Sequence, residues 1–144
     1  MPGATIIPLE FWQDPQGDVL LIYSERECSI YFPCWNENCK PADFIGQLSF
    51  EHAAGVRSFP HEYLPYKLPS HNHRSFVLHI PESKFVQEHI EYRKRHYPQY
   101  PIAEFNHYVV IGHDIYHEVL AVRFIAKMIQ IQEIQDPRLL RLLE

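Results

Sequence analysis

Short apolar runs separated by turn residues fill the beginning of the chain. After the turn at 14–17 (DPQG), residues 18–23 (DVLLIY) predict a strand, and residues 28–32 (CSIYF) predict its return partner in a hairpin. Two prolines and two asparagines crowd residues 33–41 (PCWNENCKP), so we expect a loop there.

Further strands are predicted in the middle of the chain. Apolar and polar residues alternate in 44–50 (FIGQLSF), which is typical of a half-buried strand, and 56–59 (VRSF) would continue it beyond a bend at Gly55. Residues 60–74 are rich in proline, histidine and tyrosine, and we expect a packed irregular loop. Residues 76–80 (FVLHI) predict the next strand.

A helix is expected to begin at 81–83 (PES), because proline suits the first helical turn and an acidic side chain complements the helix dipole. Val86 and Ile90 belong to its narrow apolar stripe. Basic side chains at 93–96 (RKRH) suit its C-terminal end, although they could also bind an anion, and Pro98 stops the helix.

Residues 107–122 (HYVVIGHDIYHEVLAV) fit two structures. As a helix, the segment would be capped by Asp114; as a hairpin, it would turn at 112–114 (GHD). The hairpin is favoured by the central glycine and by six β-branched residues. These residues are Val109, Val110, Ile111, Ile115, Val119 and Val122.

The C-terminal part of the chain predicts helices. Phe124, Ile125 and Met128 would lie on the apolar face of a helix over 123–135, and Asp136-Pro137 would cap a short final helix. We therefore predict one α+β domain over residues 1–144. Its fold would be a mainly antiparallel sheet with one central helix and a helical C-terminus.

Length and composition support a domain that folds on a core of its own. A chain of 144 residues can bury about 70% of the surface that it exposes when unfolded. Aromatic residues make up 14% of the sequence and favour strands. We accordingly expect no cofactor, structural metal or disulfide.

The net charge indicates which classes of partner the protein could bind, and the cysteine content indicates its cellular compartment. The net charge of −5 argues against a nucleic-acid partner and suits a basic one. An odd number of cysteines, no secretory leader and no long apolar run together predict a cytoplasmic protein without a membrane partner.

Two stretches combine into a recognisable pattern. The first is 46–53 (GQLSFEHA) followed by 55–57 (GVR); the second is 107–110 (HYVV) followed by Asp114 and 118–121 (EVLA). In this order they resemble a type of small bacterial protein of unknown function. The pattern is a "G-x-L-x-F … R" strand before a helix and an "HY … D … EVL" hairpin, and it covers about a third of the chain. The resemblance implies an interaction role and no catalytic residues.

His113 and His117 have the spacing of a zinc-protease motif, with Asp114 in place of the usual glutamate. On a helix both imidazoles could bind one Zn²⁺, with the acid activating a bound water. On a strand the two histidines would lie about 13 Å apart and could not bind the same metal ion. The favoured hairpin therefore argues against this site.

The other histidines and cysteines that could bind a metal ion do not form a recognised metal-binding motif. His71 and His73 could share a metal in an extended segment, but a polar loop is the favoured interpretation. Cys28, Cys34 and Cys39 lack the paired spacing of a zinc knuckle, so we expect free thiols.

The leading hypothesis is a non-enzymatic protein-binding module, possibly a bacterial immunity or regulatory protein. Its predicted contact residues are Tyr63, Tyr66, His71 and His73, because such side chains combine apolar area with polar tips. One alternative is a small metal-dependent hydrolase that uses His113 and His117. Another is a structural subunit forming a homodimer through a sheet edge or the leucine-rich tail.

Overall fold

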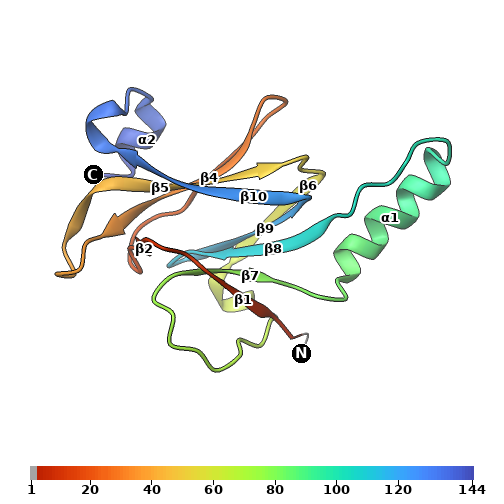
Figure 1. Ribbon diagram of the computed structural model, residues 1–144, viewed down its shortest axis with the longest axis horizontal. Coiled ribbons are helices and arrows are strands. Elements are labelled where there is room, and N and C mark those ends of the chain that lie inside the picture. The colour runs from red at the N-terminus through yellow and green to blue at the C-terminus, as the bar shows by residue number, and fades with distance from the viewer. Residues whose placement is uncertain (1–2) are drawn as a thin grey trace.

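The computed structural model describes residues 3–144 and contains two antiparallel sheets (Figure 1). The first sheet has the order β1-β7-β8-β9-β6, and the second has the order β10-β5-β4-β2, with β3 also paired to β4. The first sheet comprises β1 (Thr5–Pro8), β7 (Phe76–His79), β8 (Asn106–Ile111), β9 (Ile115–Ala121) and β6 (Gly55–Pro60). The second comprises β10 (Arg123–Gln130), β5 (Pro41–Glu51), β4 (Cys28–Trp35), β2 (Trp12–Gln13) and β3 (Leu20–Tyr23).

Residues 3–144 also form four helical segments outside the sheets. The longest is α1 (Lys84–His96), which projects beyond the ends of the strands, and α2 (Pro137–Arg141) lies at the opposite end of the molecule (Figure 1). Single turns of 3-10 helix occur at η1 (His61–Tyr63) and η2 (Ile131–Glu133). Neither α-helix in the described part of the chain is long and apolar enough to cross a membrane.

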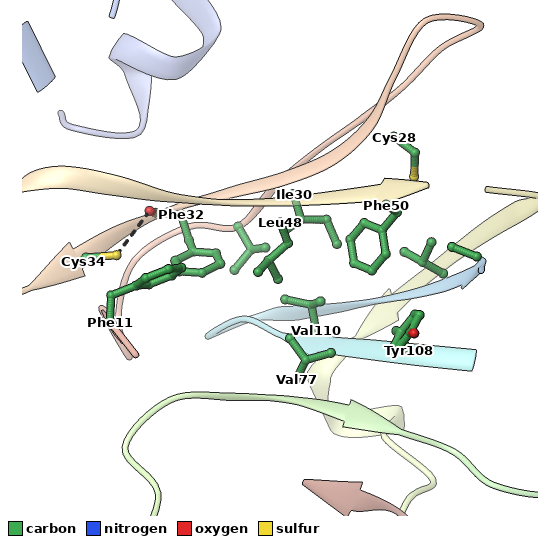
Figure 2. Close-up of a cluster of buried hydrophobic side chains, with 13 residues drawn as sticks. Phe11, Cys28, Ile30, Phe32, Cys34, Leu48, Phe50, Val77, Tyr108 and Val110 are labelled. Carbon is green, nitrogen blue, oxygen red and sulfur yellow. Dashed lines mark hydrogen bonds between the residues drawn. The ribbon is translucent and has the colours of Figure 1, made fainter. Parts of the chain in front are cut away.

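The main core lies between the two sheets. Figure 2 shows Ile30, Leu48 and Phe50 of the second sheet directed towards Val110 and Val77 of the first. Alternation along each strand places these side chains on the inner faces, which removes their apolar surface from water.

The outer face of each sheet carries a smaller core. Residues 60–74 cover the first sheet, where Tyr66 packs with Leu78 and Val109. The C-terminal segment covers the second sheet, where Leu139 packs with Ile45. Leu139 and its apolar neighbours thus hold the tail on its own domain.

The structure confirms both predicted hairpins. β3 and β4 pair through Tyr23 and Cys28, and β8 and β9 pair through Ile111 and Tyr116. At the second turn, the Gly112 N–H donates to the Ile115 carbonyl at 2.8 Å. Residues 107–122 are therefore strand and turn, as their β-branched composition predicts.

The predicted cap of the final helix is confirmed, and a helix does follow residues 81–83, but Pro81 and Glu82 lie before α1 and not in its first turn. Ser83 caps α1 by accepting a hydrogen bond from the Val86 N–H at 3.1 Å. Asp136 caps α2 by accepting one from the Arg138 N–H at 2.9 Å, with Pro137 in the first helical position. Each side-chain oxygen binds an N–H that has no acceptor within the helix.

The prediction of a helix over 123–135 is wrong, so the short helix α2 is the part of the predicted helical C-terminus that the structure retains. Residues 123–130 form β10, which pairs along its whole length with β5, from Arg123 opposite Glu51 to Gln130 opposite Phe44. Pairing with a distant strand overrides the local helical pattern. The predicted central helix is also wrong in position, because α1 lies at the periphery.

Two boundaries differ as well. The predicted loop 33–41 is shorter in the structure, because residues 33–35 belong to β4 and Pro41 begins β5. A turn remains over 36–40, where the Asn36 side chain accepts a hydrogen bond from the Asn38 N–H at 2.8 Å. Residues 56–59 do not continue β5; they belong to β6 in the other sheet. The chain changes sheets at His52, whose φ of 53° turns the backbone.

Candidate functional site

A cluster of polar side chains is buried on the outer face of the first sheet. Glu118 of β9 and His107 of β8 are 1% and 2% exposed, and Ser83 at the start of α1 is 6% exposed. Arg57 reaches Glu118 from the neighbouring strand β6, and Tyr66 reaches it from the covering segment 60–74. We call these five residues the Glu118 cluster.

The Glu118 carboxylate is the centre of this cluster. It accepts hydrogen bonds from His107 Nε2 at 2.8 Å and from Arg57 Nε at 2.5 Å, and a third from the Tyr66 hydroxyl. The Arg57 guanidinium also stacks on the Phe85 ring, 4.0 Å from its centroid. Charge pairing and full hydrogen bonding are what a buried carboxylate requires.

These contacts determine the ionisation of the Glu118 carboxyl and the Tyr66 phenol. Burial alone would raise the pKa of Glu118, but the hydrogen bonds from His107, Arg57 and Tyr66 outweigh it and lower the pKa to about 2. Burial and the hydrogen bond to Glu118 raise the pKa of Tyr66 well above its ordinary range. At neutral pH the cluster therefore holds a carboxylate and a neutral phenol.

The unfolding free energy should fall at acidic pH because Glu118 becomes protonated. Because its pKa falls from 4.5 to about 2 on folding, its contribution is complete above pH 4.5 and is lost as the pH drops towards 2. We expect a loss of about 2 kcal/mol in unfolding free energy between pH 6 and pH 3, out of about 3 kcal/mol for complete protonation. Urea denaturation between pH 6 and pH 3 measures it.

The variant Glu118→Gln provides the comparison for this measurement. Glutamine cannot ionise, so this variant should show a flatter acidic limb than the wild type. Parallel limbs in the two proteins would contradict the assignment of a low pKa to Glu118.

The ionised carboxylate of Glu118 determines which atoms of His107 and Ser83 donate hydrogen bonds. An ionised Glu118 can only accept, so His107 must donate from Nε2, and its Nδ1 is the acceptor when the imidazole is neutral. The Ser83 hydroxyl lies 2.7 Å from that Nδ1 and therefore donates to it. Ser83, His107 and Glu118 thus form a continuous hydrogen-bonded chain.

This chain reaches a cleft at the start of α1. The cleft has a volume of about 230 Å³, and Ser83 and His107 line it together with Gln87 and Phe105. Glu82, at its edge, has a φ of 53°, an uncommon conformation that leads the chain into the helix.

The four residues predicted to bind a partner are distributed differently. Tyr63 is 64% exposed, whereas Tyr66 is buried and belongs to the Glu118 cluster. His71 and His73 are exposed, with parallel rings 6.1 Å apart, and the His71 ring meets the edge of Phe76 at 4.6 Å. The structure thus places three of the four on the surface of segment 60–74.

Two clefts border the end of this segment. The Trp cleft, about 520 Å³, is lined by Trp12, Trp35 and His73 among others. The Leu cleft, about 590 Å³, is lined by residues that include Leu64 and Leu68. Arg74 and Ser75 line both clefts, so the two meet along a shared wall.

The Trp cleft combines aromatic surface with a polar rim. Trp12 and Trp35 pack edge to face with centroids 5.3 Å apart, and the Arg74 guanidinium lies 4.6 Å from the Trp12 centroid. Glu10 and Glu37 provide acidic groups at the same cleft. Aromatic anchors within a polar rim are characteristic of recognition surfaces.

His113 and His117 are not arranged as metal ligands. His113 lies in the exposed turn, whereas His117 is buried on β9. The His117 ring engages the Ser58 hydroxyl at 2.6 Å and the Val19 carbonyl at 3.3 Å. Within residues 3–144, no group of three or more histidine, cysteine or acidic side chains could hold a metal ion.

The cysteines occupy separate environments. Cys28 and Cys34 are buried free thiols on the inner face of β4, and burial raises their pKa values to about 11 and about 12. Cys39 is exposed in the turn after β4. The two buried thiols therefore remain protonated at neutral pH and behave as small apolar groups.

Sequence reasoning missed the Glu118 cluster and both tryptophans. One signal was present: Glu118 directly precedes the apolar run from Val119 to Ala121, and a charged residue in a buried strand requires a partner. Nothing in the sequence indicates that Trp12 and Trp35, far apart along the chain, become opposite residues in β2 and β4.

No family model, curated protein or solved structure matches this chain.

Proposed function

We propose that this chain is a protein-binding module that recognises an extended segment of its partner. The observation that carries the proposal is the shared wall of the Trp and Leu clefts. Arg74 and Ser75 line both clefts, so the two lie side by side, and we call them together the binding groove. An extended peptide, with side chains alternating along its length, suits a groove of this kind.

The chemistry of the groove indicates the partner. Trp12 and Trp35 offer aromatic surface at one end, and Leu64, Leu68 and Phe76 offer aliphatic and aromatic surface at the other. Glu10 and Glu37 and the net charge of −5 favour a basic segment. The expected ligand is an extended peptide with apolar and basic side chains.

The predicted contact residues take distinct roles in this proposal. His73 lines the groove, and His71 supports it through stacking. Tyr63 lies exposed at the start of the same segment. Tyr66 anchors the segment to the sheet through Glu118, so it positions the groove without contacting the partner.

Photo-crosslinking in the source cells tests the proposal. Benzoylphenylalanine at His73, beside Trp12, should capture a partner protein, and fragmentation should map the adduct to an extended segment of it. The same probe at Tyr92 is the control, because Tyr92 is 51% exposed on α1, away from the groove. Identical adducts at both positions would overturn the proposal.

A matched pair of double variants measures affinity. Tyr63→Ala/His73→Ala removes two exposed side chains and should weaken capture of the identified partner at least about tenfold, which equals about 1.4 kcal/mol. Tyr92→Ala/His96→Ala makes the same chemical change on α1 and should leave capture unchanged. Equal affinities in the two variants would contradict the groove assignment.

A further inference from the structure

We propose that Ser83 is a nucleophile, activated by His107, that cleaves small acyl esters in the cleft at the start of α1. This activity is separate from the binding groove and does not depend on it. The geometry that carries the proposal is the chain Ser83 Oγ, His107 and Glu118, with contacts of 2.7 Å and 2.8 Å, which ends at a cleft.

Each member of the chain has the role that acyl transfer requires. His107 Nδ1 is placed to accept the Ser83 proton, and Glu118 holds the Nε2–H and stabilises the imidazolium that forms. The two ring nitrogens are exchanged relative to the usual serine-protease arrangement. Either nitrogen can act as the base provided the other is held by a carboxylate.

The surroundings of Ser83 favour developing negative charge. Its oxygen accepts a hydrogen bond from the Val86 N–H, and it lies at the positive end of the 13-residue helix α1. Gln87, one helical turn further on, lines the same cleft and offers an amide donor for an oxyanion. The cleft volume of about 230 Å³ limits the substrate to a short acyl chain.

The reaction balances with water as the only co-reactant. Ser83 Oγ forms a bond to the ester carbonyl carbon while its proton passes to His107 Nδ1. The tetrahedral adduct then collapses, the bond to the alcohol oxygen breaks, and the alcohol leaves with the proton from His107. Water attacks the acyl-serine, gives its proton to Nδ1, and the carboxylic acid leaves as Ser83 recovers a proton.

A second serine–histidine pair provides an internal comparison. The Ser58 hydroxyl lies 2.6 Å from His117 Nδ1, but His117 Nε2 contacts the Val19 carbonyl, and no carboxylate of residues 3–144 is hydrogen-bonded to this ring. Burial also lowers the pKa of His117, which makes it a weaker base. The proposal therefore assigns reactivity to Ser83 and not to Ser58.

Active-site labelling of the wild-type protein is the first test. A small fluorophosphonate should add once, and peptide mapping should place the adduct on Ser83. p-Nitrophenyl acetate should be hydrolysed faster than in buffer alone. Absence of an adduct on the folded wild-type protein, or an adduct on Ser58 only, would overturn the proposal without reference to any variant.

Variants separate catalysis from folding. Ser83→Asn preserves the helix cap but removes the nucleophile, so labelling and turnover should both be lost while the melting temperature stays close to that of the wild type. His107→Gln should lower turnover about 10²–10⁴-fold. Ser58→Ala should leave both readouts unchanged; turnover that survives in folded Ser83→Asn would contradict the assignment.

Discussion

Substitution of Glu118 with alanine is expected to lower the free energy of unfolding by about 3–5 kcal/mol. The change leaves Arg57 without its counter-charge and leaves the Tyr66 hydroxyl and His107 Nε2, both buried, without an acceptor. Unsatisfied buried donors cost about 1–3 kcal/mol each, so the network is worth more than one contact. Urea denaturation followed by circular dichroism measures the loss.

Glu51→Ala is the matched control for this prediction. Glu51 is also a strand carboxylate paired with an arginine, Arg123, but both side chains of that pair are partly exposed to water. Exposed ion pairs contribute about 0–1 kcal/mol, so this variant should be close to wild type. Equal losses in the two variants would show that burial does not determine the strength of the Glu118 cluster.

Local sequence features predicted the elements whose geometry depends on neighbouring residues. The turn at Gly112 and the cap at Asp136 each involve contacts within a few positions, so residue type alone indicates them. The hairpin of β8 and β9 also follows from composition, because β-branched side chains favour strands.

The strand β10 could not be predicted in this way. Phe124, Ile125 and Met128 fit a helical face, yet pairing with β5 places Phe124 against the inner core and leaves Ile125 42% exposed. The decisive contacts join residues 44–51 to residues 123–130. Such long-range pairing depends on the whole fold and not on the local pattern.

The same limit applies to the candidate sites. Ser83 precedes α1, whereas His107 and Glu118 come from β8 and β9. The binding groove likewise combines β2, β4 and the end of segment 60–74. That segment was correctly predicted to pack down, because Tyr66, Leu64 and Leu68 pack on the sheet. Its dual role, as the cover of the first sheet and as a wall of the groove, appears only in three dimensions.

Phe32→Ala is the second substitution with a large expected effect, a loss of about 3–5 kcal/mol in unfolding free energy. Phe32 is fully buried between the sheets and lies beside Phe11, with ring centroids 5.9 Å apart (Figure 2). Truncation removes most of its apolar contact and leaves a cavity that the sheets cannot close by collapse. Urea denaturation at neutral pH measures the loss.

Gly46 makes this prediction specific to the packing of Phe32. The two residues are directly opposite in β5 and β4, and a Cβ at Gly46 would lie 2.5 Å from the Phe32 ring and 2.7 Å from that of Phe11. Gly46→Val alone should therefore cost about 1–3 kcal/mol through overcrowding. In the Phe32→Ala background the valine enters vacated space, so the double variant should lose at least about 1 kcal/mol less than the sum of the single variants. Strict additivity would show that Gly46 is not kept small by the Phe32 ring.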